Sequence, residues 1–141
     1  MSKTQRKLTW GYSGWGVDPA NLQNPNFQNT TELDWFYIVA PGKALPRAIE
    51  LDSPSFMEST CKISALKENQ ANLIQQAILS VNPKASQDIE LQKRGEEILQ
   101  NTEKGTAFCR PTGEAQKYST CECVIFLKFS GGKQALQEKL K

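Results

Sequence analysis

Residues 118–129 read YSTCECVIFLKF, and this stretch predicts a long β-strand. Side chains along a strand point alternately to the two faces of a sheet. One predicted face carries sulfur and apolar groups, from Cys121, Cys123, Ile125, Leu127 and Phe129. The opposite face carries Tyr118, Thr120, Glu122, Val124, Phe126 and Lys128. We expect the first face to pack against the core, beneath a helix.

Two further strands are predicted on either side of a helical region. Residues 35–39, WFYIV, are aromatic or β-branched and are stopped by Pro41 and Gly42. Their unbroken apolar run is typical of a central strand that is covered on both faces. Residues 106–110 indicate a shorter strand, and the turn residues 111–113 follow it.

The longest predicted helix begins at Pro54 and ends near Val81. Ser53 is suited to cap its first turn, and Asn82 with the following proline ends it. Apolar residues at three- and four-residue spacings form a stripe that includes Cys61. A weaker helix is expected over residues 86–102, with apolar positions at Ile89, Leu91, Ile98 and Leu99. Residues 133–141 indicate a closing helix.

This order of elements predicts one α+β domain over residues 34–141, with a small, mostly antiparallel sheet and helices packed on one face. Residues 1–33 are expected to be irregular, because glycine, proline and asparagine interrupt them repeatedly. Three large aromatic residues nevertheless fall close together there, at Trp10, Tyr12 and Trp15. They either pack onto the domain and hold its N-terminus, or form an aromatic platform for sugar or peptide.

The cysteines are Cys61, Cys109, Cys121 and Cys123. Because Cys121 and Cys123 share one face of a strand, they are poorly placed to bond each other. We therefore expect two disulfides, in which Cys61 bonds to one of this pair and Cys109 to the other. The alternatives are four free thiols in a cytosolic protein and a zinc site. The zinc site is disfavoured because the chain lacks paired cysteines at knuckle spacing, so no metal site is predicted.

No catalytic site or cofactor is predicted. The chain has no histidine, so a catalytic cysteine would lack its usual base. The acidic pairs Glu96 with Glu97, and Glu32 with Asp34, lie in polar surroundings that indicate solvated side chains. Gly131, Gly132 and Lys133 form either an anion-holding helix start or a simple turn. With 17 basic and 15 acidic residues among 141, no nucleic-acid partner is expected.

Several short segments of the sequence resemble those of a known family. They are LTWGYSGWG (8–16), DWFY (34–37), STCK (59–62), CRPTG (109–113) and CECVIFLKFSGGKQAL (121–136). All four cysteines fall within these segments or at their edges. The chain resembles the twenty-one-kilodalton outer-membrane lipoprotein family of the spirochaete genus Leptospira, over about half of its length.

The resemblance implies a lipoprotein made with a signal peptide, acylated on an N-terminal cysteine and anchored in the outer membrane, at the cell surface or facing the periplasm. That cysteine is absent from this chain, so its only membrane link would be an anchor outside it, and residues 2–9 would be remnants of the tether. The implied roles are envelope integrity, peptidoglycan association and evasion of host innate immunity. The family supplies no catalytic residues.

The leading hypothesis is therefore a non-enzymatic lipoprotein domain that binds peptidoglycan or host macromolecules. Its candidate contact residues are Trp10, Tyr12, Trp15 and Trp35. The first alternative is a protein-protein module that inhibits or masks host factors. The others are a cytosolic α+β binding protein and a cryptic hydrolase.

Overall fold

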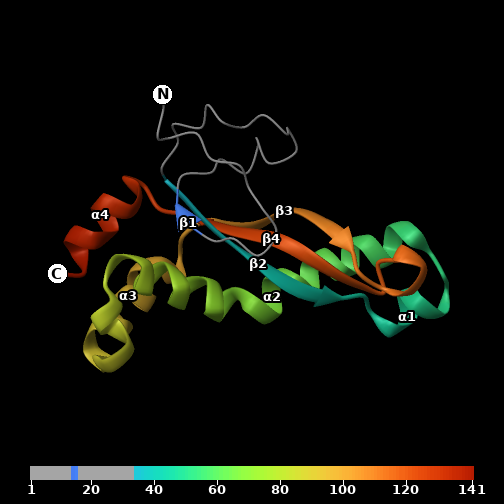
Figure 1. The fold of residues 1–141 in the computed structure, drawn as a ribbon, viewed down its shortest axis with the longest axis horizontal. Helices are drawn as coiled ribbons and strands as arrows, with labels where there is room; N and C mark the ends of the chain where they lie inside the picture. The colour runs from blue at the N-terminus through green and yellow to red at the C-terminus, as the bar shows by residue number, and fades with distance from the viewer. Residues whose placement is uncertain (1–13, 16–33) are drawn as a thin grey trace.

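The fold is that of a computed structural model, which describes residues 14–15 and 34–141. Within these residues four strands form one antiparallel sheet in the order β1-β2-β4-β3 (Figure 1). The strands are β1 (Gly14–Trp15), β2 (Trp35–Lys43), β3 (Lys104–Pro111) and β4 (Thr120–Lys128). The two long strands, β2 and β4, pair with each other at the centre of the sheet.

The long helix lies along one face of this sheet, and the other main helices pack against that helix (Figure 1). The helices are α1 (Pro46–Glu50), α2 (Pro54–Val81), α3 (Ile89–Gln100) and α4 (Gly132–Lys139), with the 3₁₀ turns η3 (Pro83–Gln87) and η4 (Glu114–Gln116). The predicted α+β class, with an antiparallel sheet and helices on one face, is confirmed.

The alternation predicted for residues 118–129 governs the core. Cys121, Cys123, Ile125 and Leu127 are buried, and they belong to the cluster that includes Leu73 of α2. Phe36 of β2 lies opposite Leu127 and joins the same face. The neighbouring Tyr37 faces the other way and is also buried, as expected for a central strand.

The ends of α2 follow the signals in the sequence. The Ser53 hydroxyl accepts a hydrogen bond from the Phe56 amide at 3.4 Å, and Pro54 occupies the first turn. At the other end, the Asn82 backbone turns to an extended conformation and ends the helix. Between these ends most of the apolar stripe is buried, and the predicted helix is confirmed over its whole length.

The predicted helix over residues 86–102 is wrong at its start. Residues 83–87 form the separate turn η3, and Asp88 in an extended conformation begins α3. The Asp88 carboxylate accepts from the Leu91 amide at 3.1 Å, which caps the new helix. This start leaves Ile89 on the outside, 75% exposed, rather than on the apolar face.

Other features depart from the expectation. Strand β2 continues to Lys43 through Pro41 and Gly42, which were expected to stop it, because these residues still pair with β4. Helix α1 was not predicted, and β3 extends over Lys104–Pro111 rather than residues 106–110. Within the segment expected to be irregular, Gly14 and Trp15 pair with Tyr37 and Phe36 as the edge strand β1. The remaining residues of 1–33 lie outside the described part of the chain.

Two disulfides connect the elements. Cys61–Cys121 joins α2 to β4, and Cys109–Cys123 joins β3 to β4. The corresponding Cα–Cα distances are 6.3 Å and 4.0 Å. The expected pairing, in which neither Cys121 nor Cys123 bonds the other, is confirmed.

We predict that each disulfide stabilises the fold by lowering the conformational entropy of the unfolded chain. The sequence separations are 60 for Cys61–Cys121 and 14 for Cys109–Cys123. From the loop entropy we expect the free energy of unfolding to fall by about 4 kcal/mol when Cys61 and Cys121 are replaced by alanine, and by about 3 kcal/mol when Cys109 and Cys123 are. Urea unfolding of the two double variants would measure these losses, and peptide mapping of the non-reduced protein would check the pairing. Recovery of a Cys61–Cys109 or Cys121–Cys123 peptide would contradict it.

Candidate functional site

The sheet face opposite the helices carries an aromatic cluster, which we define as Trp35, Phe126 and Lys128. Trp35 of β2 pairs with Lys128 of β4, so their side chains stand side by side. The rings of Trp35 and Phe126 are 4.9 Å apart at 75°, an edge-to-face arrangement. The Lys128 ammonium lies 5.2 Å from the centre of the Trp35 ring, within the range of a cation–π contact. All three side chains are half-buried.

A glycine on the neighbouring strand makes room for this cluster. Gly105 of β3 pairs with Phe126, and a Cβ atom there would lie 2.8 Å from the tip of the Phe126 ring. The ring therefore lies across the glycine backbone. Further along the same face, Arg110 pairs with Glu122 through its Nε at 2.9 Å. The face thus presents aromatic groups next to charged ones.

Trp15, another candidate, lies on the helical face instead. Its indole N–H donates to the Ser80 hydroxyl of α2 at 2.7 Å, and its ring lies 5.2 Å from that of Phe36. Ser80 in turn donates to the Ala77 carbonyl at 2.6 Å. The sheet therefore separates Trp15 from Trp35, while Trp10 and Tyr12 lie outside the described residues. The position of Trp15 agrees with the interpretation in which this ring packs onto the domain.

The possible anion site at the start of α4 already has a carboxylate. The Gly131 amide donates to Asp34 Oδ1 at 3.2 Å, and Gly131 has the left-handed φ of 91° that favours glycine. This segment is thus a turn fastened to the beginning of β2. Of the acidic pairs, Glu96 and Glu97 are exposed on α3, while Glu32 lies outside the described residues.

A polar cleft of about 380 Å³ opens where β2 and β4 end near α2, and Lys43, Glu68 and Asn69 contribute to its walls. Several of its polar groups serve the fold. The Asn69 amide donates to the Pro41 carbonyl at 2.9 Å and to the Ala65 carbonyl at 2.8 Å. These hydrogen bonds of Asn69 fasten α2 to the end of β2. We therefore do not assign a ligand to the cleft.

Two pKa shifts are resolved among the described groups. Burial, and then the nearby Glu58 carboxylate, raises the pKa of Tyr118, whose hydroxyl donates to the Cys109 carbonyl at 3.1 Å. Burial lowers the pKa of Lys104. A tyrosine phenol is already neutral at physiological pH, and a raised pKa does not change this. The Tyr118 hydroxyl therefore remains a hydrogen-bond donor to β3.

No protein-family model, curated protein or solved structure matches the chain. Among the helices of residues 34–141, none is long and apolar enough to cross a membrane.

Sequence reasoning named Trp35 but missed its two neighbours. Phe126 and Lys128 were assigned to the face away from the core, and this alternation was the signal available. The pairing of Trp35 with Lys128 joins distant parts of the chain, so only the register of β2 against β4 completes the cluster.

We predict that the Trp15 contact with α2 is structural. Ser80→Ala removes the acceptor of a half-buried indole N–H and should lower the free energy of unfolding by about 1 kcal/mol. Denaturant unfolding would measure the loss, with Ser86→Ala as a control because the Ser86 hydroxyl donates to the Pro83 carbonyl of its own 3₁₀ turn. Equal stability of the two variants would contradict a structural role for this hydrogen bond.

Proposed function

We propose that the chain is a non-enzymatic domain of an outer-membrane lipoprotein, which binds peptidoglycan or host macromolecules outside the cytoplasm. In this role it supports envelope integrity or immune evasion. The observation that carries the proposal is the aromatic cluster on the sheet face opposite the helices. An indole held edge-on by a phenyl ring and flanked by an ammonium suits a partner with both apolar and anionic groups.

Peptidoglycan has both kinds of group. The C–H face of a sugar ring can stack on the indole of Trp35, while the ammonium of Lys128 can pair with a carboxylate of the peptide stem. Phe126 fixes the indole before the ligand arrives, which reduces the entropy lost on binding. The cluster therefore offers a small, pre-organised contact of the kind that anchors a larger interface.

Two further observations support the extracytoplasmic part of the proposal. Disulfides persist in oxidising compartments and are rare in the cytosol, and the described chain has two of them and no free cysteine. The resemblance to the leptospiral lipoprotein family supports the two other parts of the proposal, the location in the cell envelope and the lipid anchor.

The second candidate function is a protein-protein module that masks or inhibits host factors. It is favoured by the exposed pair Arg110 and Glu122, which extends the same face with charges suited to a protein partner. A protein interface would cover both the cluster and this pair, whereas a sugar contact would need only the cluster.

We predict that Trp35→Ala weakens sedimentation with purified peptidoglycan sacculi by roughly tenfold, about 1.4 kcal/mol. The loss is expected because the stacking surface is removed. Ile89→Ala is the matched control, because Ile89 is 75% exposed on α3, away from the sheet. Both variants would be checked for intact disulfides and an unchanged circular dichroism spectrum.

The outcomes separate the two functions. Equal recovery of folded Trp35→Ala and wild type would remove the aromatic cluster from a peptidoglycan site. Failure of the wild type to sediment with sacculi, together with binding to purified host innate-immune proteins that Arg110→Ala weakens, would favour the masking function.

A further inference from the structure

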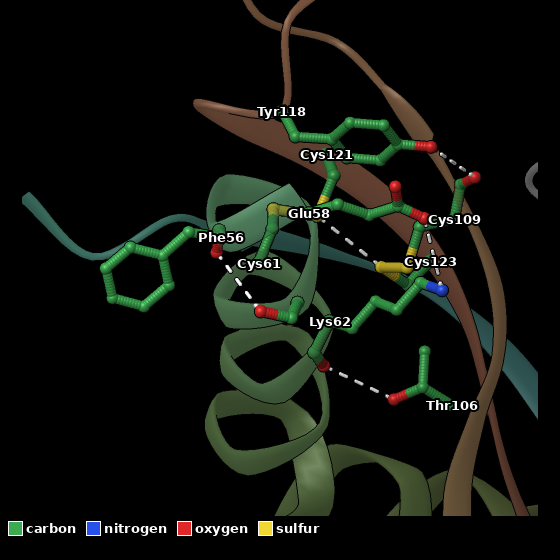
Figure 2. A network of polar contacts seen from close by, with 10 residues as sticks. Phe56, Glu58, Cys61, Lys62, Thr106, Cys109, Tyr118, Cys121 and Cys123 are labelled. Atoms are coloured by element: carbon green, nitrogen blue, oxygen red, sulfur yellow. Dashed lines mark hydrogen bonds and ion pairs between the residues drawn. A yellow bond between two sulfur atoms is a disulfide. The ribbon is translucent and has the colours of Figure 1, made fainter. Parts of the chain in front are cut away.

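The four sulfur atoms of the two disulfides lie together between α2, β3 and β4 (Figure 2). Cys121 Sγ and Cys123 Sγ are 3.4 Å apart although they are not bonded to each other. The Sγ atoms of Cys109, Cys121 and Cys123 all lie within 4.8 Å of one another. Cys61 lies outside this group of three, and its bond to Cys121 places the fourth sulfur next to it.

The distance between the unbonded sulfurs of Cys121 and Cys123 is close to that between two thiolates of a tetrahedral metal site. A metal–sulfur bond of about 2.3 Å places neighbouring sulfurs about 3.8 Å apart around zinc. The unbonded contact between Cys121 and Cys123 needs to lengthen only slightly to reach it. The two bonded pairs would separate to the same spacing by rotation about their Cα–Cβ bonds once the disulfides are reduced.

The surroundings would keep the sulfurs together after reduction. The strand β4 is paired along its length with both β2 and β3, and α2 is held to the sheet by fully buried apolar side chains such as Leu73 and Ile125. Cys61 and Cys123 are fully buried, while Cys109 is half-buried and offers an entry. Water is therefore largely excluded from three of the four ligands.

We propose that the reduced protein binds one soft divalent cation of the zinc class through Cys61, Cys109, Cys121 and Cys123. A phosphine reductant converts each disulfide to two thiols, and the phosphine takes its oxygen from one water molecule. The cation then displaces the thiol protons as it binds four thiolates. The metal would replace the disulfides as the link between α2, β3 and β4.

Cobalt(II) is the probe for this site. The full chain, reduced with a phosphine without oxygen, should bind one equivalent of Co²⁺ and acquire thiolate-to-cobalt charge-transfer absorption with the visible bands of tetrahedral coordination. Zn²⁺ should abolish these bands by displacing the cobalt. The oxidised protein is expected to show neither absorption, because its sulfurs are bonded to one another.

The control is the Cys61→Ser/Cys121→Ser double variant, which retains only the two cysteines of one cross-strand pair. It should lose the tetrahedral spectrum. The proposal is overturned if reduced wild type gives no charge-transfer absorption, if the double variant gives the same spectrum, or if the reduced chain is unfolded and the metal does not restore its circular dichroism.

Discussion

Cys121 and Cys123 point to the same face of β4, and each is bonded to a different element. Cys121 holds α2 through Cys61, and Cys123 holds β3 through Cys109. One strand thereby fixes both a helix above it and a strand beside it. The approach of α2 is close, because the Cys61 carbonyl oxygen would lie 2.5 Å from a Cβ atom at Gly42 of β2. A residue with a side chain at that position would push the helix away from the disulfide that anchors it.

The same constraint divides the molecule into two faces with different chemistry. Apolar residues of α2, α3 and α4 cover the face that bears the sulfurs, and Leu99 and Leu136 are fully buried there. The Asn82 amide, at the end of α2, donates to the Leu140 carbonyl at 2.8 Å and fastens the C-terminal end of the fold. The described helices pack on this face. On the opposite face Tyr37 and Val124 are also buried, whereas Trp35, Phe126 and Lys128 are half-buried.

Much of this fold could be predicted because its signals are local. Alternation defined β4, and Ser53 with Pro54 defined the start of α2. Features that depend on distant partners were missed or misplaced. A two-residue strand such as β1 has no period of its own and exists through its pairing with β2. Asp88 caps α3, whereas the helix was predicted from residue 86 with Ile89 among its apolar positions. The aromatic cluster required the register between β2 and β4.

Trp15 and Trp35 illustrate why composition alone could not select the contact residue. Both are half-buried tryptophans in paired strands of one sheet. Trp15 lies opposite Phe36, so its side chain points to the core face, and its indole N–H donates to the Ser80 hydroxyl. Trp35 precedes Phe36 by one residue, and that single step turns its ring to the other face, beside Phe126 and Lys128. Strand parity thus assigns Trp15 to the packing of α2 and places Trp35 on the opposite face, in the cluster that we propose as a contact site.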